Sequence, residues 1–203
     1  LGIGGCTALL LAGMGMRASI RNIAADQFGN IMKYDFAILF DAAKDEAEMD
    51  DFRSETSGLL SECVFVCDDT LEVPTKAGEK TVNVIATGDD AIADMIDLHE
   101  DDGQHVDYPP DGSVVISDKL ASVAGVSVGD TITVRLSDST QCSLPVSGIF
   151  ENYVYHYMLM TPATYESIFG KDCEYESALA SSALDDVHDV SARLISDCGA
   201  SNV

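Results

Sequence analysis

Tryptophan is absent from the 203-residue sequence, proline occurs 5 times, and basic residues are scarce. The chain holds 11 Lys and Arg against 35 Asp and Glu, which leaves a formal net charge of -24 at pH 7. Proteins that bind nucleic acids use basic surfaces that displace counterions, so this charge excludes nucleic acid as a partner. Hydrophobic residues still make up 46% of the chain. The composition is therefore that of a folded protein rather than a disordered one.

No motif in the sequence identifies an enzyme. The segment Gly125-Val126-Ser127-Val128-Gly129 matches the serine motif of α/β hydrolases, in which a strand precedes the serine and a helix follows. Here a helix is expected before Ser127 and a strand after it, which is the reverse order. A phosphate loop is not formed by Gly78-Glu79-Lys80-Thr81, because glutamate precedes the lysine. We expect no catalytic residue and no cofactor, and a serine esterase acting through Ser127 is the weakest alternative.

Acidic residues are concentrated between Lys80 and Lys119, a segment with no Lys or Arg. Outside a cell such a segment can collect calcium through carboxylate oxygens, so a calcium-dependent binding module is a second alternative. The EF-hand pattern fails, because the loop that begins at Asp97 has Tyr108 where the pattern requires glutamate. The histidines show no metal-binding spacing either. We expect a solvated acidic loop and no metal site.

The sequence contains six cysteines and does not decide which of them pair. Cys6 falls in an apolar run, and the five that remain are an odd number, so at least one stays reduced or pairs with another chain. Cys63 and Cys67 share one face of an expected strand and lie about 13 Å apart, which is too far for a disulfide between them.

The N-terminal run Leu1–Met16 has no charged residue and contains five glycines. A complete membrane span needs roughly 20 apolar residues, and glycine is better tolerated in membrane helices than in water-soluble ones. We interpret this run as the end of a transmembrane helix, with a buried helix of the fold as the alternative. Apolar residues at helical spacing from Arg17 to Phe28 predict an amphipathic stalk. Arg17 and Arg21 favour a cytoplasmic domain, but a large domain is translocated regardless of such local charges, and we expect it outside.

The remaining elements predict an α+β fold with a split βαβ, porter-like core and an inserted small β-rich subdomain, preceded by the membrane helix and stalk. Residues 1–30 form the membrane and stalk part, 31–96 and 171–203 the core, and 97–170 the insertion. The core has strands at 34–40, 63–73, 80–87 and 175–180, a helix capped by Asp41, and a helix at 185–198. The insertion has strands at 113–116, 130–136, 142–149 and 153–160, and helices at 118–124 and 162–169.

Three stretches resemble the FtsX-like (MacB-like) ABC transporter permeases. The opening GCTALLLAGMGMRASIRNIAADQFGNIMKYDFAILFD resembles the first membrane helix, the stalk and the first extracytoplasmic strand of these proteins. The stretches VVISDKLASVAGVSVGDTITVRL and VSGIFENYVYHYMLMTPATYESIFG resemble the β-rich part of their extracytoplasmic core. The resemblance covers roughly residues 1–40 and 113–170.

This resemblance implies a noncatalytic domain on the extracytoplasmic side of the cell membrane. It would couple motion driven by a separate cytoplasmic ABC ATPase to substrate movement or partner engagement outside the membrane. The ATPase would contact the membrane part and not this domain, and an extracytoplasmic protein or peptide is a further expected partner.

Tyr153, Tyr155 and Tyr157 alternate along an expected strand and would point the same way. Tyrosine is enriched at interfaces, so these three form a candidate interaction surface. The alternative is that they pack on the core of the insertion. If the domain lies between two membrane helices, the ends at Phe28 and Val203 should share one side, and Gly103–Pro110 and Tyr153 should form the far tip.

Overall fold

A computed structural model describes residues 27–76 and 78–203. The predicted membrane helix and most of the predicted stalk lie outside these residues. Within them, no helix is both long and apolar enough to cross a membrane.

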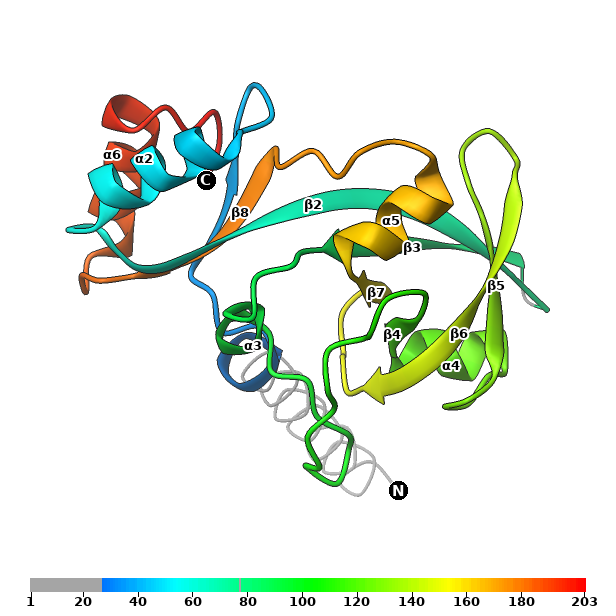
Figure 1. Cartoon of the computed structure of the whole chain (residues 1–203). Coiled ribbons are helices and arrows are strands. Elements are labelled where there is room, and N and C mark those ends of the chain that lie inside the picture. Colours follow the sequence, from blue (N-terminus) through cyan, green and yellow to red (C-terminus); the bar gives the residue numbers. More distant parts are fainter. Residues whose placement is uncertain (1–26, 77) are drawn as a thin grey trace, which may run out of the picture.

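The described chain has a mixed α+β fold built on one eight-stranded sheet (Figure 1), as the sequence predicts at this level. The helices are the π-helix η1 (Gln27–Ile31), α2 (Glu46–Thr56), α3 (Ile92–Met95), α4 (Asp118–Ala124), α5 (Pro162–Phe169) and α6 (Val187–Asp197). The strands are β1 (Phe36–Leu39), β2 (Leu60–Thr75), β3 (Gly78–Ala86), β4 (Val114–Ser117), β5 (Thr131–Arg135), β6 (Gln141–Phe150), β7 (Tyr157–Met160) and β8 (Ser177–Ser182).

The strands lie in the order β1-β8-β2-β3-β7-β4-β6-β5, with a further contact between β2 and β5. Most neighbours are antiparallel, whereas β3 with β7 and β4 with β6 are parallel. In the long β2–β3 hairpin, the register runs from Cys67 opposite Ala86 to Thr75 opposite Gly78. The N-terminal half of β2 pairs instead with β8, from Leu60 opposite Ser182 to Val66 opposite Ser177.

Three groups of buried side chains hold the fold together. One joins β1 and β8 to α2 and α6, and is centred on Phe40, Phe52 and Phe65. A second lies around η1 and α3, and a third fills the space between β3–β7, α4 and α5. The strand β2 contributes to all three through Phe65, Val66 and Leu71. The division into a 31–96/171–203 core and a 97–170 insertion stays a prediction.

Helix boundaries follow local capping interactions. The cap of α2 is Asp45 and not Asp41 as predicted: its side chain accepts from the amide of Glu48 at 2.9 Å, and the Glu48 carboxylate accepts from the amide of Asp45 at 3.0 Å. This reciprocal pair satisfies two amides that Asp41 cannot reach. Thr161 caps α5 by accepting from the amide of Thr164, and Gly125 ends α4 in the left-handed conformation.

One predicted strand is much shorter than expected. The sequence predicts a strand over 153–160, but β7 begins only at Tyr157. Residues 153–155 form a bend, in which Tyr155 has a φ of 63°. The short helix α3, without a side-chain cap, was not predicted.

Candidate functional site

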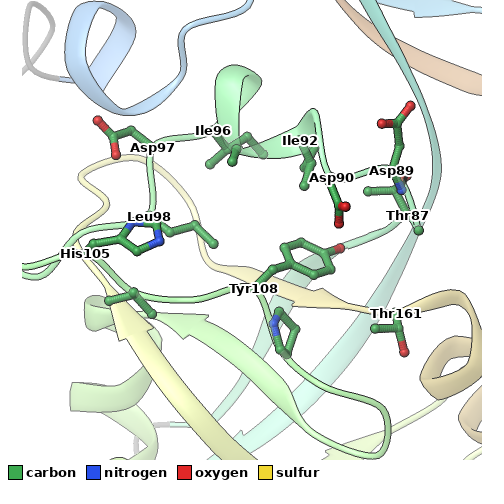
Figure 2. Close-up of a pocket in the computed structure, with 14 residues that line it drawn as sticks. Thr87, Asp89, Asp90, Ile92, Ile96, Asp97, Leu98, His105, Tyr108 and Thr161 are labelled. Carbon is green, nitrogen blue, oxygen red and sulfur yellow. Dashed lines mark hydrogen bonds between the residues drawn. The ribbon is translucent and has the colours of Figure 1, made fainter.

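A cavity of about 300 Å³ lies between α3, the loop that follows it and the start of α5 (Figure 2). The segment around Thr87 and Asp89 supplies one side, and the chain from Ile96 to Leu98 and from His105 to Pro109 supplies the rest. Residues 87–109 therefore build most of this cavity, Thr161 adds a contribution from a distant part of the sequence, and we call it the α3 pocket.

The wall of the α3 pocket is largely apolar. Ile92, Ile96 and Leu98 are buried and belong to the core group around η1 and α3. Tyr108 packs against the same group, and its hydroxyl donates to the carbonyl of Met160 at 2.7 Å. Burial raises the pKa of the Tyr108 hydroxyl above its ordinary value, so this phenol stays protonated. The wall can accept an apolar group but offers no activated nucleophile from Tyr108.

Three carboxylates line the mouth of the α3 pocket, and two of them already have basic partners. The Asp89 carboxylate lies 3.1 Å from the Arg53 guanidinium, and the Asp97 carboxylate lies 2.9 Å from the Lys33 ammonium. The hydrogen bond from Lys33 is the main reason that the pKa of Asp97 is lowered. The third carboxylate, Asp90, points toward the hydroxyl end of Tyr108 in Figure 2. Asp90 is therefore the carboxylate that faces the cavity.

Next to this pocket, a buried pair of amide side chains links the start of the described chain to the loop before β7. Gln27 is 1% exposed and Asn152 is 0% exposed. The Gln27 amide donates to Asn152 Oδ1 at 2.8 Å, and Gln27 Oε1 accepts from the amides of Tyr153 and Val154 at 2.8 and 3.1 Å. Asn152 in turn donates to the Val154 carbonyl at 2.6 Å. We call these four residues the Gln27 network.

The three candidate tyrosines do not form one alternating row. Tyr153 and Tyr157 pack against the core group around η1 and α3, and burial raises the pKa of Tyr157 to about 12. Tyr155 is 72% exposed in the left-handed backbone conformation. The Tyr153 hydroxyl donates to the Glu151 carboxylate, and the Lys119 ammonium donates to the Tyr153 carbonyl. Of the three tyrosines, only Tyr155 is therefore largely exposed to solvent. The use of these residues as an interaction surface stays a prediction.

The expected position of Tyr153 at a tip far from the N-terminal end is wrong, because its backbone amide donates to the side chain of Gln27, the first residue of η1. The two ends of the described chain are also separated. Asn202 pairs with Leu39 at the C-terminal end of β1, whereas η1 precedes the N-terminal end of that strand (Figure 1). The sequence gives no signal for the Gln27 network, since its contacts span 125 to 127 positions.

Ser127 lies in the turn between α4 and β5, in the predicted order of helix, serine and strand. Its amide donates to the Asp130 carboxylate at 2.8 Å, which holds the turn. Among residues 27–76 and 78–203, no three His, Cys, Asp or Glu side chains are grouped to hold a metal ion.

No protein-family model matches the sequence, and no curated protein is significantly similar to it. Several solved structures are similar in fold, among them the following three. The extracellular domain of YknZ, a noncanonic ABC-type transporter from Gram-positive bacteria, has a TM-score of 0.50 at 12% identity, over 77% of this chain and 89% of that chain. The periplasmic region of MacB from Actinobacillus actinomycetemcomitans gives a TM-score of 0.45 at 11% identity, over 83% and 86%. A domain of a protein named as a permease, from Porphyromonas gingivalis, gives 0.43 at 15% identity, over 79% and 70%.

The likeness to YknZ covers most of both chains. This likeness shows the fold alone, because an identity of 12% carries no information on individual residues. The chain therefore has the fold of the extracellular domain of an ABC-type transporter, the fold that its resemblance to the FtsX-like permeases implies.

Proposed function

We propose that this chain is a noncatalytic extracytoplasmic domain of an FtsX-like ABC transporter permease. The observation that carries the proposal is the shared fold with the extracellular domain of YknZ, at a TM-score of 0.50 over 77% of the chain. The net charge of -24 also fits a domain that keeps away from anionic lipid headgroups and nucleic acids. The ATPase partner is a separate cytoplasmic subunit that contacts the membrane part of the protein.

The role of the domain is mechanical coupling. Gln27 opens η1, at the end of the predicted stalk, and its side-chain amide binds the loop of residues 152–154. A displacement of η1 therefore acts on that loop through buried hydrogen bonds, which are costly to break without replacement. The loop leads into β7, in the middle of the sheet. Motion arriving through the stalk would thus reach the sheet and not only its edge.

Engagement of a partner uses the α3 pocket. Its apolar wall fits an apolar side chain of a protein or peptide, and Asp90 at its mouth favours a neighbouring basic group. Tyr155 adds an exposed aromatic ring on the same part of the molecule as the Gln27 network. The preferred partner is a peptide segment with a basic residue beside an apolar one.

The location is tested by labelling intact cells that produce the full membrane protein with a membrane-impermeant maleimide. Val128→Cys introduces a thiol at a site that is 55% exposed, and Leu120→Cys introduces one at a site that is 0% exposed. Because native cysteines are partly exposed, labelling is compared with that of the unsubstituted protein. We expect additional labelling of the first variant in intact cells, and of the second only after denaturation. Labelling at position 128 that requires cell lysis would place the domain in the cytoplasm and contradict the proposal.

The permease assignment is tested by purifying the same protein from membranes in mild detergent. We expect an ATP-hydrolysing subunit to co-purify and vanadate to inhibit its activity. Asn152→Ala should leave ATP hydrolysis in place while weakening the response of the complex to its extracytoplasmic partner. Purification of the intact protein without any ATP-hydrolysing subunit would overturn the assignment.

A further inference from the structure

Two cysteines from distant parts of the sequence lie side by side on the sheet. Cys67 is on β2 and is 3% exposed. Cys173 is in the segment between α5 and β8, and it packs against the same buried group as Cys67. The two thiols are direct hydrogen-bonding neighbours. In Figure 1 the segment that carries Cys173 runs alongside β2 on its way from α5 to β8.

The neighbouring residues show that this approach is a matched alignment of two chain segments. Asp69 is two residues after Cys67, and Lys171 is two residues before Cys173; the Lys171 ammonium lies 2.9 Å from the Asp69 carboxylate. Alternate residues of an extended chain point to the same side. The Asp69–Lys171 ion pair and the Cys67–Cys173 contact are therefore successive contacts between segments that run in opposite directions.

Aromatic contacts fix the same alignment from the side of α5. The Tyr165 hydroxyl donates to Asp69 at 2.9 Å, and the ring of Tyr165 stacks on Phe169 at a centroid distance of 4.3 Å. The Lys171 ammonium lies 5.7 Å from the centre of the Tyr165 ring. Noncovalent contacts thus hold the segment against β2 before any bond forms between the sulfur atoms.

We propose that Cys67 and Cys173 form a disulfide bond that joins β2 to the segment between α5 and β8. The oxidant is an external disulfide of low molecular weight. One thiol of the pair, as its thiolate, attacks one sulfur of that disulfide and releases one thiol. The other thiol of the pair then loses its proton, attacks the protein sulfur of this mixed disulfide and releases the second thiol. Two electrons and two protons pass from the protein to the external disulfide, which becomes two thiols.

The electrostatic surroundings distinguish Cys67 from the other described cysteines. The pKa of the Cys67 thiol is lowered, mainly by its hydrogen bond with Cys173, with Lys171 adding a positive charge nearby. The pKa values of Cys63, Cys142 and Cys198 are raised, in each case mainly by burial. The pKa of the Cys173 thiol is raised, mainly by the same hydrogen bond, so Cys67 is the member of the pair whose thiolate, the reactive form in exchange, is favoured.

This inference stands apart from the proposed function, because it depends only on the fold and is tested on the purified chain. The 203-residue chain is equilibrated with oxidised and reduced glutathione, quenched in acid, alkylated in denaturant and digested with trypsin. Trypsin leaves Cys67 on residues 54–76, together with Cys63, and leaves Cys173 on residues 172–193. The Cys63→Ser variant therefore gives a peptide pair whose link is unambiguous.

We expect these two peptides to be linked, with a mass two hydrogens below their sum, and the link to disappear on reduction and in Cys67→Ser. Closing a loop of this length should raise the melting temperature of the oxidised protein by about 5–15 °C. The Cys67→Ser/Cys173→Ser double variant should melt at one temperature in both redox buffers.

Two results would overturn the inference. One is full alkylation of both cysteines in the oxidised, folded protein. The other is a link from Cys173 to Cys142 or Cys198 in place of Cys67. If Cys67→Ser fails to fold, the peptide map of the Cys63→Ser variant alone still decides between these outcomes.

Discussion

Gln27 and Asn152 are 125 positions apart in sequence and are joined by a 2.8 Å hydrogen bond between side chains that are almost completely buried. Two amides in a buried site are stable only when their polar atoms find partners. Here the partners are each other and the backbone of residues 153–155. The pair thus sets the conformation of the loop before β7 and the position of η1 together.

Replacing Gln27 should lower the unfolding free energy substantially, because its side chain has several buried hydrogen-bond partners. Gln27→Ala leaves the amides of Tyr153 and Val154 and the Asn152 side chain without this partner. We expect a loss of about 2–4 kcal/mol of unfolding free energy, measured by urea denaturation. The exposed Gln104→Ala should change it by less than about 0.5 kcal/mol. Equal effects of the two substitutions would show that the network contributes nothing specific.

Tyr155 should be replaceable by glycine without loss of stability. Its φ of 63° is unfavourable for a residue with a side chain, and 72% of the residue is exposed. We expect Tyr155→Gly to raise the unfolding free energy by roughly 0–1 kcal/mol and to weaken partner binding. Ser139→Gly, at φ 70°, is the matched substitution and should leave binding unchanged. A marked destabilisation by Tyr155→Gly would indicate that the ring serves the fold.

Gly148 on β6 should not tolerate alanine. A Cβ atom there would lie 2.5 Å from Val106 Cγ1 and 3.2 Å from Val115 Cγ2. We expect Gly148→Ala to cost about 1–3 kcal/mol, and Val106→Ala to recover part of this in the double variant. Gly58→Ala, where nothing lies within 4 Å, is the control. Additive losses in the double variant would argue against the clash with the wall of the α3 pocket.

The Lys33–Asp97 pair predicts a specific change in the response to acid. The folded-state pKa of Asp97 is lowered, mainly by the hydrogen bond from Lys33. This contribution to stability is present above the unfolded-state pKa of about 3.9 and is lost as the pH falls through the lower folded-state value. Both side chains are partly exposed, so the effect on stability is small.

Lys33→Met should therefore raise the pKa of Asp97, as measured by NMR titration of its carboxyl carbon. It should also flatten the loss of stability below pH 4. Lys44→Met, beside α2, is the control and should leave the pKa of Asp97 unchanged. An Asp97 pKa that is unchanged in Lys33→Met would assign the shift to the nearby histidines.

Ser127 should not react as a nucleophile. Its amide is fixed by Asp130 in a turn that follows a helix and precedes a strand. A fluorophosphonate probe should label the protein no more than it labels Ser127→Ala. Labelling that disappears in this variant would revive the esterase alternative.

Elements with strong local patterns could be predicted from the sequence. The boundaries of α4 and α5 follow from Gly125 and Thr161, which act within one turn of the chain. The cap of α2 was open to prediction as well, because Asp45 and Glu48 have the spacing of a capping box. The prediction of Asp41 as the cap did not take this reciprocal pair into account.

The candidate site could be predicted only in part, because long-range contacts create it. The alternation of Tyr153, Tyr155 and Tyr157 is typical of a strand, yet Gln27 and Asn152 bind the backbone of residues 153–155 and bend it. The α3 pocket combines Thr87, Leu98 and Thr161, which no local pattern relates. The helix α3 has four residues, too few to show a helical period.

The single strand β2 runs through all three buried groups, pairing with β8 over its first half and with β3 over its second. A shared strand of 16 residues leaves no flexible joint along its length at which the two ends of the domain can bend independently. Each half is hydrogen-bonded to a neighbouring strand, to β8 over Leu60–Val66 and to β3 over Cys67–Thr75. If the domain transmits motion as proposed above, the continuity of this one strand would carry a displacement from the α2 and α6 end to the α4 and α5 end.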